Sequence, residues 1–301
     1  MATIFGDPHT LSPESFTRER HAMADDRIHR AVSADGTEIA GRVHGQGPPI
    51  VLVHGRPHDG DIAWEAMLPY LTDRFTCYLP STRGRGLSAD SPDHSPPRLQ
   101  EDFNTFVDSI GGPVLLAGWS TGGPWALGVA AHGAGVAAVA VYEPTVIPVM
   151  QQVERDSLLD MAKQMGVADR EGRLQDAARS FHAWLGTHEE MAALDADYLL
   201  RCAAVIPAAL RSIHQSTSFE GSQPTDPEVL GKVSVPVLLL RGQRTLRDTF
   251  YADSELYVAE NVGDPHLREP LPGLGHWAPI LDPEPIVNEW IRFFESVMQP
   301  A

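Results

Sequence analysis

The chain has 301 residues, of which 43% are hydrophobic, enough to bury the core of one large α/β domain or two small ones. A formal net charge of −17 repels nucleic-acid phosphates and anionic lipid headgroups, so the composition argues against both as partners. No apolar run is long enough to span a bilayer, no secretory signal is visible, and two distant cysteines, Cys77 and Cys202, indicate no disulfide framework, so we expect a cytoplasmic protein.

The N-terminal part of the chain is expected to form an arm followed by a hairpin. Residues 1–26 are polar and weakly patterned, which is typical of a loose tail. Two short alternating segments then flank Asp35 and Gly36, a dipeptide that favours the tight turn of a β-hairpin. We therefore expect the folded part of the chain to begin with two antiparallel strands.

Beyond the hairpin, apolar strand patterns alternate with helical patterns. Strands are predicted at residues 50–55, 75–80, 114–119, 136–143, 235–242 and 266–273. Helices are predicted near residues 61–72, near 97–110, from about 122, near 250–260 and near 284–297. Strands that are apolar along their whole length are buried on both faces, so the alternation predicts an α/β fold with a mostly parallel sheet covered by helices on both sides.

One segment, residues 147–222, interrupts this alternation. It is rich in Ala, Leu, Met, Gln and charged residues at helical spacing, so we predict a helical cap inserted after the sixth strand. The flanking segments, residues 27–146 and 223–301, would then form one core domain. Because open α/β sheets bind ligands at the carboxyl ends of their strands, we expect the cap to cover the binding site.

Ser120 stands between glycines where a predicted strand passes into a helix, in the sequence Gly118-Trp119-Ser120-Thr121-Gly122. Glycines on both sides allow a tight turn without side-chain clashes, so the serine hydroxyl would project above the edge of the sheet. The amino terminus of the following helix would also favour developing negative charge. This pattern predicts a nucleophile elbow with Ser120 as the nucleophile.

His276 is the best-placed base for that serine. A serine hydroxyl is a poor nucleophile unless a base lies within hydrogen-bonding reach and an acceptor orients the base. His276 lies in a loop between the last predicted strand and the last predicted helix, where Gly273 and Gly275 would let the imidazole turn back over the sheet.

The loop after the first long strand, His54-Gly55-Arg56-Pro57, is expected to face the serine across the strand ends. Acyl transfer places negative charge on the substrate oxygen, and two fixed N–H donors stabilise that charge best. We expect the backbone amides of Arg56 and Thr121 to form this oxyanion hole, whereas His54 is expected to be structural.

The chain resembles the α/β-hydrolase superfamily in the order and spacing of four features: residues 54–57, the sequence RGRGLS at residues 83–88, residues 118–123 and His276. The resemblance covers about residues 28–297. It implies an eight-stranded, mostly parallel sheet, a nucleophile after strand five, a helical cap after strand six and the chain order serine, acid, histidine. We expect neither a cofactor nor a metal ion.

The acid of this expected catalytic triad has two main candidates. Relatives usually carry it a few residues after strand seven, where residues 243–245 of this chain read Gln-Arg-Thr, without a carboxylate. Asp248 follows three residues later, and Asp253 lies further on. A minority of the superfamily carries its acid at the end of strand six, where this chain has Glu143. Glu143 is our first candidate, and Asp248 stays open.

Aromatic residues near these positions are candidates for the substrate pocket. They are Trp119, His58 and Trp277, together with Phe181 and Trp184 from the cap. Together they indicate a site for an apolar acyl or alcohol group.

The sequence therefore predicts a serine hydrolase that cleaves a small to medium apolar ester or lactone through an acyl-enzyme. A small carbonyl compound is the expected partner, and a homodimer stays open. The same site would also suit a hydrolase of carbon–carbon bonds or a perhydrolase that uses peroxide. A catalytically silent binding protein is the alternative of a different class, and the missing acid after strand seven is its only support.

Overall fold

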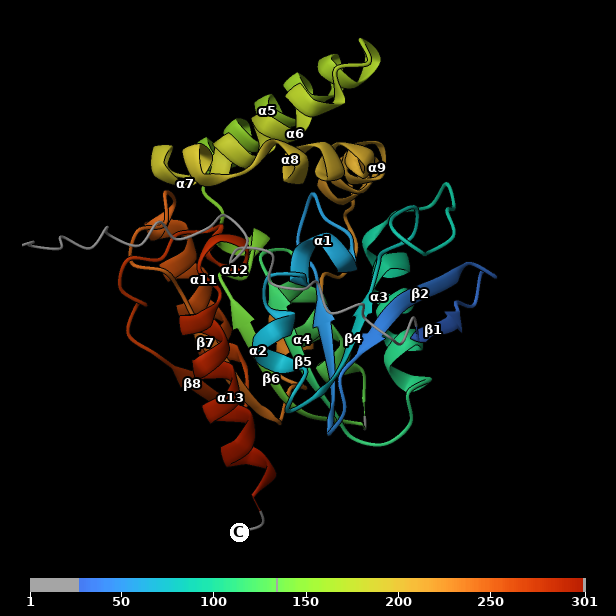
Figure 1. Ribbon diagram of the computed structural model, residues 1–301, viewed down its shortest axis with the longest axis vertical. Helices are drawn as coiled ribbons and strands as arrows, with labels where there is room; N and C mark the ends of the chain where they lie inside the picture. Colours follow the sequence, from blue (N-terminus) through green and yellow to red (C-terminus); the bar gives the residue numbers. More distant parts are fainter. Residues whose placement is uncertain (1–26, 134, 300–301) are drawn as a thin grey trace, which may run out of the picture.

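The computed structural model describes residues 27–133 and 135–299. The arm expected at residues 1–26 lies outside these residues. The described residues form a central sheet with helices on both faces, and a further layer of helices lies across one end of the molecule (Figure 1).

In the described part of the chain the sheet has eight strands, in the order β1-β2-β4-β3-β5-β6-β7-β8. The strands are β1 (Arg27–Val32), β2 (Glu38–His44), β3 (Pro49–Val53), β4 (Thr76–Pro80), β5 (Val114–Trp119), β6 (Val136–Tyr142), β7 (Pro236–Leu240) and β8 (Asp264–Leu267). Strand β2 runs antiparallel to β1 and β4, and the other pairs are parallel. The predicted eight-stranded, mostly parallel sheet is therefore confirmed.

The helices that flank the sheet are α1 (Gly60–Trp64), α2 (Leu68–Leu71), α3 (Pro96–Asp108), α4 (Gly122–His132), α10 (Pro227–Leu230), α11 (Asp248–Asn261), α12 (Ala278–Leu281) and α13 (Glu284–Met298). The single helix predicted at 61–72 is two short helices, because Pro69 has no N–H to bond the preceding turn. The last strand, Asp264–Leu267, begins two residues before the predicted range 266–273 and ends before Pro270, which cannot donate to a sheet ladder. Among the described residues, no helix is both long and apolar enough to cross a membrane.

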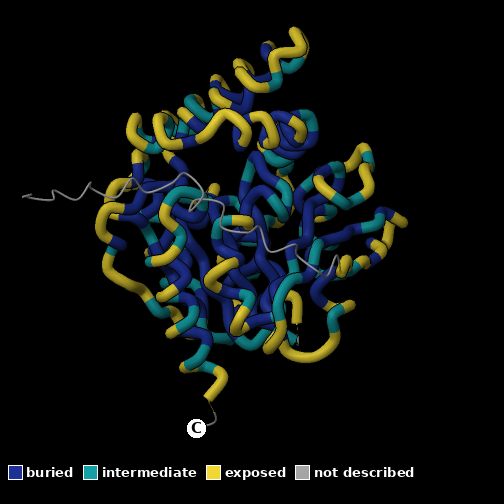
Figure 2. Tube along the Cα trace, viewed as in Figure 1, coloured by how far each residue is buried: buried dark blue, intermediate teal, exposed yellow. Residues whose placement is uncertain are grey.

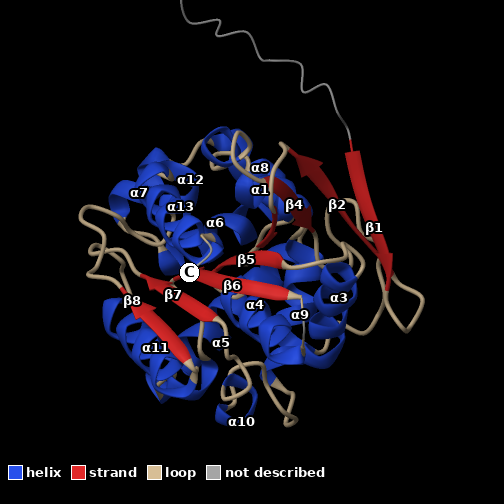
Figure 3. Ribbon diagram, turned by 90° about the horizontal axis from the view of Figure 1, so that it is seen from below, coloured by secondary structure: helices blue, strands red, loops and turns tan. Residues whose placement is uncertain are grey.

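The two faces of the sheet bury different sets of side chains. Along β5, Leu115, Ala117 and Trp119 pack toward α1, α2 and α13, whereas Val114 and Leu116 pack toward α3, α4 and α11. Figure 3 shows α13 and α1 on one side of the sheet, and α3 and α4 on the other. Because both faces are buried, every residue of β5 is apolar or glycine, which is why the sequence pattern of this strand was unambiguous.

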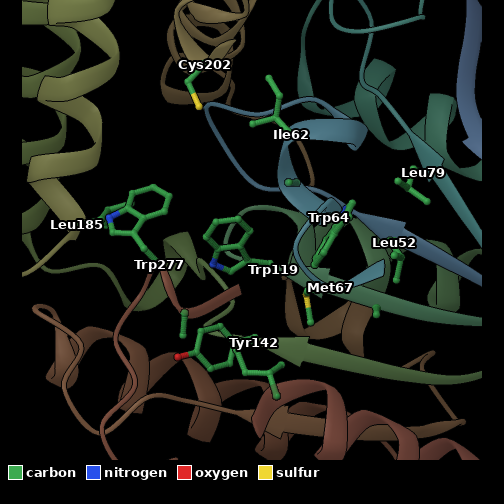
Figure 4. Close-up of a cluster of buried hydrophobic side chains, with 14 of the residues drawn as sticks. Leu52, Ile62, Trp64, Met67, Leu79, Trp119, Tyr142, Leu185, Cys202 and Trp277 are labelled. Atoms are coloured by element: carbon green, nitrogen blue, oxygen red, sulfur yellow. The ribbon is translucent and has the colours of Figure 1, made fainter. Parts of the chain in front are cut away.

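The chain between β6 and β7 forms a helical insertion. Its elements are η2 (Ile147–Val149), α5 (Gln152–Arg170), α6 (Leu174–Leu185), α7 (His188–Ala193), α8 (Ala196–Ala204) and α9 (Ile206–Thr217). Its outer surface is exposed and its inner side is buried (Figure 2). One cluster of buried hydrophobic side chains runs from the sheet through Trp119 and Trp277 to Leu185 of the insertion (Figure 4). The insertion is thus packed on the sheet domain through a shared core.

Helix α4 begins in close contact with the end of β3. A Cβ atom added to Gly122 would lie 2.0 Å from the carbonyl oxygen of Val53 and 2.8 Å from that of His54. These are backbone atoms and cannot give way to a methyl group. The glycine is therefore required by the close approach of the β5–α4 turn to the loop after β3.

We expect Gly122→Ala to lower the free energy of unfolding by about 1–3 kcal/mol, because the added methyl group forces these two segments apart. Equilibrium unfolding in urea measures the change. Gly166→Ala in α5 is the matched control, since its nearest neighbour beyond its own helix backbone would be Arg170 Nη1 at 3.5 Å, an ordinary contact. Unchanged stability of Gly122→Ala would contradict the close approach.

Candidate active site

Ser120 occupies a strained turn between β5 and α4. Its φ is +55°, in the left-handed region that residues other than glycine rarely adopt. The Ser120 amide donates to the carbonyl oxygen of Tyr142 at 3.0 Å, and its carbonyl oxygen accepts from the amide of Thr145 at 3.1 Å. A Cβ atom on Gly118 would lie 2.7 Å from the carbonyl oxygen of Gly122, so a side chain there would block the turn. The predicted elbow geometry is therefore present around Ser120.

His276 and Glu143 form a buried hydrogen-bonded pair. His276 Nδ1 lies 2.7 Å from Glu143 Oε2, and both side chains are fully buried. Two further donors reach the carboxylate: the amide of Gly242 at 3.0 Å and the hydroxyl of Thr245 at 3.2 Å. Because a carboxylate only accepts, His276 donates through Nδ1–H, which leaves the lone pair on Nε2. This is the tautomer that a general base needs.

The loop that carries His276 is fixed from two sides. From the sheet domain, the Tyr142 hydroxyl donates to the carbonyl oxygen of Gly275 at 2.7 Å, and Trp119 Nε1 donates to that of His276 at 3.1 Å. From the insertion, Glu190 Oε1 accepts from the amide of Trp277 at 2.8 Å. The imidazole is thus held by both parts of the molecule.

Ser120 and His276 are not joined by a hydrogen bond in this structure. Ser120 Oγ lies 3.4 Å from the hydroxyl oxygen of Thr145. His276 Nε2 is buried and has no hydrogen-bond partner among the described residues. Catalytic hydrogen bonds are often long or poorly aligned without substrate, so this geometry is compatible with an acid–base role for His276.

Tyr251, on α11, contacts both His276 and Ser120. Its ring stacks on that of His276, with centroids 5.1 Å apart and planes inclined by 17°. Its hydroxyl interacts with those of Ser120 and Thr145. Burial, reinforced by the negative charge of Glu143, raises the pKa of Tyr251 well above its usual value, so the phenol stays a hydrogen-bond donor. Sequence analysis missed Tyr251, because a tyrosine in an ordinary helical pattern carries no motif.

The loop after β3 passes beside Ser120, as expected for an oxyanion hole. A Cβ atom on Gly55 would lie 3.0 Å from Ser120 Cβ and 3.6 Å from Ser120 Oγ. The backbone amides of Arg56 and Thr121 make no backbone hydrogen bond within the described residues. Both residues line the same cavity as Ser120.

His54, in the same loop, uses both ring nitrogens within the protein. Nε2 accepts from the amide of Thr82 at 3.1 Å, and Nδ1 donates to the carbonyl oxygen of Gly55 at 2.8 Å. Burial lowers the pKa of His54 to about 3, so the ring is neutral at ordinary pH. His54 therefore fixes the loop and is not available as a base.

Asp248, the other candidate acid, is engaged elsewhere. It begins α11 and forms an ion pair with Arg241, and its side chain is 57% exposed. Glu143 already accepts from His276 Nδ1, so the structure does not bring Asp248 to the imidazole.

A small cavity of about 40 Å³ adjoins Ser120 under the insertion. Its apolar walls come from both parts of the molecule and include Phe181 and Trp184, as expected: Ile147, Met150, Leu158, Phe181, Trp184, Leu185, Ile213 and Phe250. It shares Arg56, Thr121 and Thr145 with a larger cavity of about 430 Å³, which extends to residues 216–221 and 223–225. The two together give Ser120 a largely apolar surrounding.

The other three expected pocket residues, Trp119, His58 and Trp277, do not line either of these cavities. The His58 ring stacks on Trp119 at 5.0 Å between centroids, and Trp277 meets Trp119 edge-on at 5.5 Å. They form a buried layer behind the site, in which Figure 4 shows both tryptophans. Successive side chains of a strand point in opposite directions, so Trp119 faces the core and not the cavity. The prediction that these three side chains line the substrate pocket therefore does not agree with the structure.

One group of described residues has the ligand types that a metal ion needs. Potential ligand atoms of His58, His182 and Cys202 lie within 4.8 Å of one another and are buried. The Tyr198 hydroxyl oxygen lies 2.6 Å from His58 Nε2 and 3.2 Å from His182 Nε2. The phenol therefore bridges the two imidazoles and joins the loop after β3 to the insertion, while His58 Nδ1 has no hydrogen-bond partner among the described residues.

This arrangement can perform nucleophilic chemistry on a carbonyl group. A serine hydroxyl lies in an apolar cavity with two backbone amides beside it. An imidazole with a lone pair on Nε2 lies nearby, oriented by a buried carboxylate. These are the groups that acyl transfer requires.

Comparison with known proteins agrees with this fold. A family model described as "Alpha/beta hydrolase family" matches residues 50–289. The pimeloyl-[acyl-carrier protein] methyl ester esterase of Stenotrophomonas maltophilia (strain R551-3) is 32% identical over 217 residues, which cover 67% of this chain and 76% of the esterase. The 2-hydroxy-6-oxo-6-(2'-aminophenyl)hexa-2,4-dienoic acid hydrolase of Metapseudomonas resinovorans is 25% identical over 275 residues, or 88% of this chain and 90% of that enzyme.

Among solved structures, a bromoperoxidase from Bacillus anthracis superposes with a TM-score of 0.72 at 16% identity, covering 89% of this chain and 100% of the bromoperoxidase. At 16% identity, this structural similarity supports a shared fold and nothing more specific. The family match and the sheet topology lead to one conclusion: this chain belongs to the α/β-hydrolase family.

Proposed function

We propose that the protein is a serine hydrolase in which Ser120 is the nucleophile, His276 the general base and Glu143 the acid of the triad. The observation that carries this proposal is the buried hydrogen bond of 2.7 Å between Glu143 and His276, beside a serine in a strained strand-to-helix turn. Such a pair orients the imidazole and offsets the positive charge that the imidazole gains during catalysis. Relatives named as an esterase and a hydrolase support the same class.

The reaction begins when Ser120 Oγ leaves Thr145 and attacks the carbonyl carbon of the substrate, while its proton passes to His276 Nε2. The carbonyl oxygen becomes an oxyanion that accepts hydrogen bonds from the amides of Arg56 and Thr121. As the tetrahedral intermediate collapses, the leaving group takes the proton from His276 and departs. Ser120 then carries the acyl group as an ester.

Water completes the cycle. His276 Nε2 takes a proton from the water molecule, whose oxygen attacks the acyl carbon. The second tetrahedral intermediate releases the carboxylic acid and returns the proton to Ser120 Oγ. Tyr251 holds the imidazole plane during both steps, because its ring is stacked on that of His276.

We propose a small to medium ester or lactone as the substrate. The apolar walls of the cavity suit a hydrocarbon chain next to the reacting carbonyl group. A carbon–carbon bond hydrolase is the second candidate, and the relative from Metapseudomonas resinovorans favours it.

We expect p-nitrophenyl esters to be cleaved faster than vinylogous diketones, and no peroxide-dependent halogenation above background. Faster cleavage of the diketones would select the second candidate.

We expect a fluorophosphonate probe to label the wild-type protein once and to leave Ser120→Ala unlabelled, because the probe reacts only with an activated serine. Intact-protein mass spectrometry measures the adduct. Ser180→Ala is the control, since that hydroxyl donates to the carbonyl oxygen of Asp176 in its own helix, α6. A folded wild-type protein that neither labels nor cleaves any carbonyl compound would favour the binding-protein alternative.

We expect Glu143→Gln to lower kcat by about three to four orders of magnitude, because an amide no longer fixes the tautomer of His276 or offsets its charge. Asp248→Asn makes the matched change at the other candidate position, and we expect its kcat to stay close to that of the wild type. Steady-state hydrolysis of one p-nitrophenyl ester compares the three proteins. If Glu143→Gln stays nearly fully active, Glu143 is not the acid.

A further inference from the structure

Two arginine side chains line the small cavity beside Ser120, and neither has a carboxylate partner among the described residues. They are Arg56, from the loop after β3, and Arg247, at the start of α11. Both are partly buried. A positive charge at a partly apolar wall is costly unless an opposite charge or a set of hydrogen bonds compensates it.

The Arg56 guanidinium bonds only to neutral groups of α9. Nε donates to Ser212 Oγ at 3.1 Å, and Nη2 donates to Ser216 Oγ at 3.1 Å and to the carbonyl oxygen of Ser212 at 3.4 Å. A second buried cation, Arg85, donates to the same Ser212 hydroxyl at 3.2 Å. Burial lowers the pKa of Arg56 to about 10, so it is still charged at neutral pH. Positive charge therefore accumulates at this wall.

The Arg247 guanidinium is likewise held by neutral groups of the insertion. Its guanidinium carbon lies 4.0 Å from the centre of the Trp184 ring, a cation–π contact. Nε donates to the carbonyl oxygen of Trp184 at 3.2 Å, and Nη2 donates to Ser157 Oγ at 3.5 Å. These contacts fix the side chain without neutralising it, and they leave Nη1 without a partner among the described residues.

Two buried or partly buried arginines elsewhere in the protein are neutralised by carboxylates. Arg83 is fully buried and pairs with Asp102 at 2.7 Å and with Asp35 at 2.8 Å. Arg241 pairs with Glu255 at 3.0 Å. Carboxylates thus compensate some buried cations of this chain, whereas Arg56 and Arg247, like Arg85 and Arg155, have only neutral hydrogen-bond partners among the described residues.

One carboxylate, that of Glu154, also lines the small cavity. Its Oε2 atom accepts from the backbone amide of Gln151 at 3.0 Å, where it caps the start of α5. It forms an ion pair with neither arginine, although its negative charge acts on Arg247 through space. With two cations and one anion, the wall keeps a net positive charge.

We propose that the cavity contains a carboxylate-binding subsite, and that the preferred substrates are esters or lactones that carry a free carboxylate beyond an apolar segment, such as half esters of dicarboxylic acids. This inference rests on the proposed function of Ser120. The reacting carbonyl would lie at Ser120, the chain along the apolar wall, and the carboxylate at Arg247, with Arg56 adding to the attraction. A guanidinium fork matches a carboxylate in two parallel hydrogen bonds.

The test compares monomethyl adipate with its neutral analogue, in which a primary amide replaces the free carboxylate. For the wild-type protein we expect kcat/KM for the anion to exceed that for the amide by about 10- to 100-fold, as for a hydrogen bond to a charged group. Arg247→Gln should lose most of this ratio, and Arg247→Lys should keep part of it. Arg173→Gln, which removes an exposed charge of the insertion paired with Asp176, should leave the ratio unchanged.

Binding to Ser120→Ala, measured by calorimetry with the same two compounds, separates the two proposals because it needs no turnover. Tighter binding of the anion, lost when Arg247→Gln is added, supports the subsite even if no ester is cleaved, and that outcome would count against the proposed function alone. Equal or weaker binding of the anion, together with an equal or lower kcat/KM for it, would overturn the subsite while leaving the hydrolase proposal intact.

Discussion

The hydrogen bond between Glu143 and His276 is the interaction on which the arrangement of the site depends. A fully buried carboxylate is tolerated only if donors surround it, and here His276, the amide of Gly242 and the hydroxyl of Thr245 supply them. Space for this cluster is limited: a Cβ atom on Gly242 would lie 2.4 Å from the carbonyl oxygen of Leu274 and 2.6 Å from the Tyr142 hydroxyl. The loops after β6, β7 and β8 are therefore fitted to one another around one carboxylate.

The position of Glu143 follows from the strand order. Strand β6 lies between β5 and β7, so its carboxyl end is adjacent both to the Ser120 turn and to the loop after β7. That second loop has no carboxylate at residues 243–245, and instead Thr245 donates a hydrogen bond to Glu143. This loop thus contributes a hydrogen-bond donor to the carboxylate of Glu143, which follows the neighbouring strand.

The helical insertion is a structural part of the site as well as its cover. It shares one hydrophobic cluster with the sheet domain, and Glu190 holds the backbone beside His276. The cavity beside Ser120 exists only between the two parts, with the elbow on one side and Phe181, Trp184 and Ile213 on the other. Its apolar lining comes from both parts, and its two arginines belong to the sheet domain but are held by side chains and backbone of the insertion.

Sequence alone determined the fold, because each central strand is apolar along its whole length, and it indicated Ser120 and His276, because glycines mark the turns that expose them. It left Glu143 and Asp248 open, since only the tertiary structure decides which carboxylate reaches a given imidazole nitrogen. It misplaced Trp119, His58 and Trp277 and missed Tyr251, because the direction of a side chain depends on packing between distant segments. The sequence also does not show which charged side chains form ion pairs. Only the tertiary structure shows that Arg56 and Arg247 line a cavity without a carboxylate partner among the described residues.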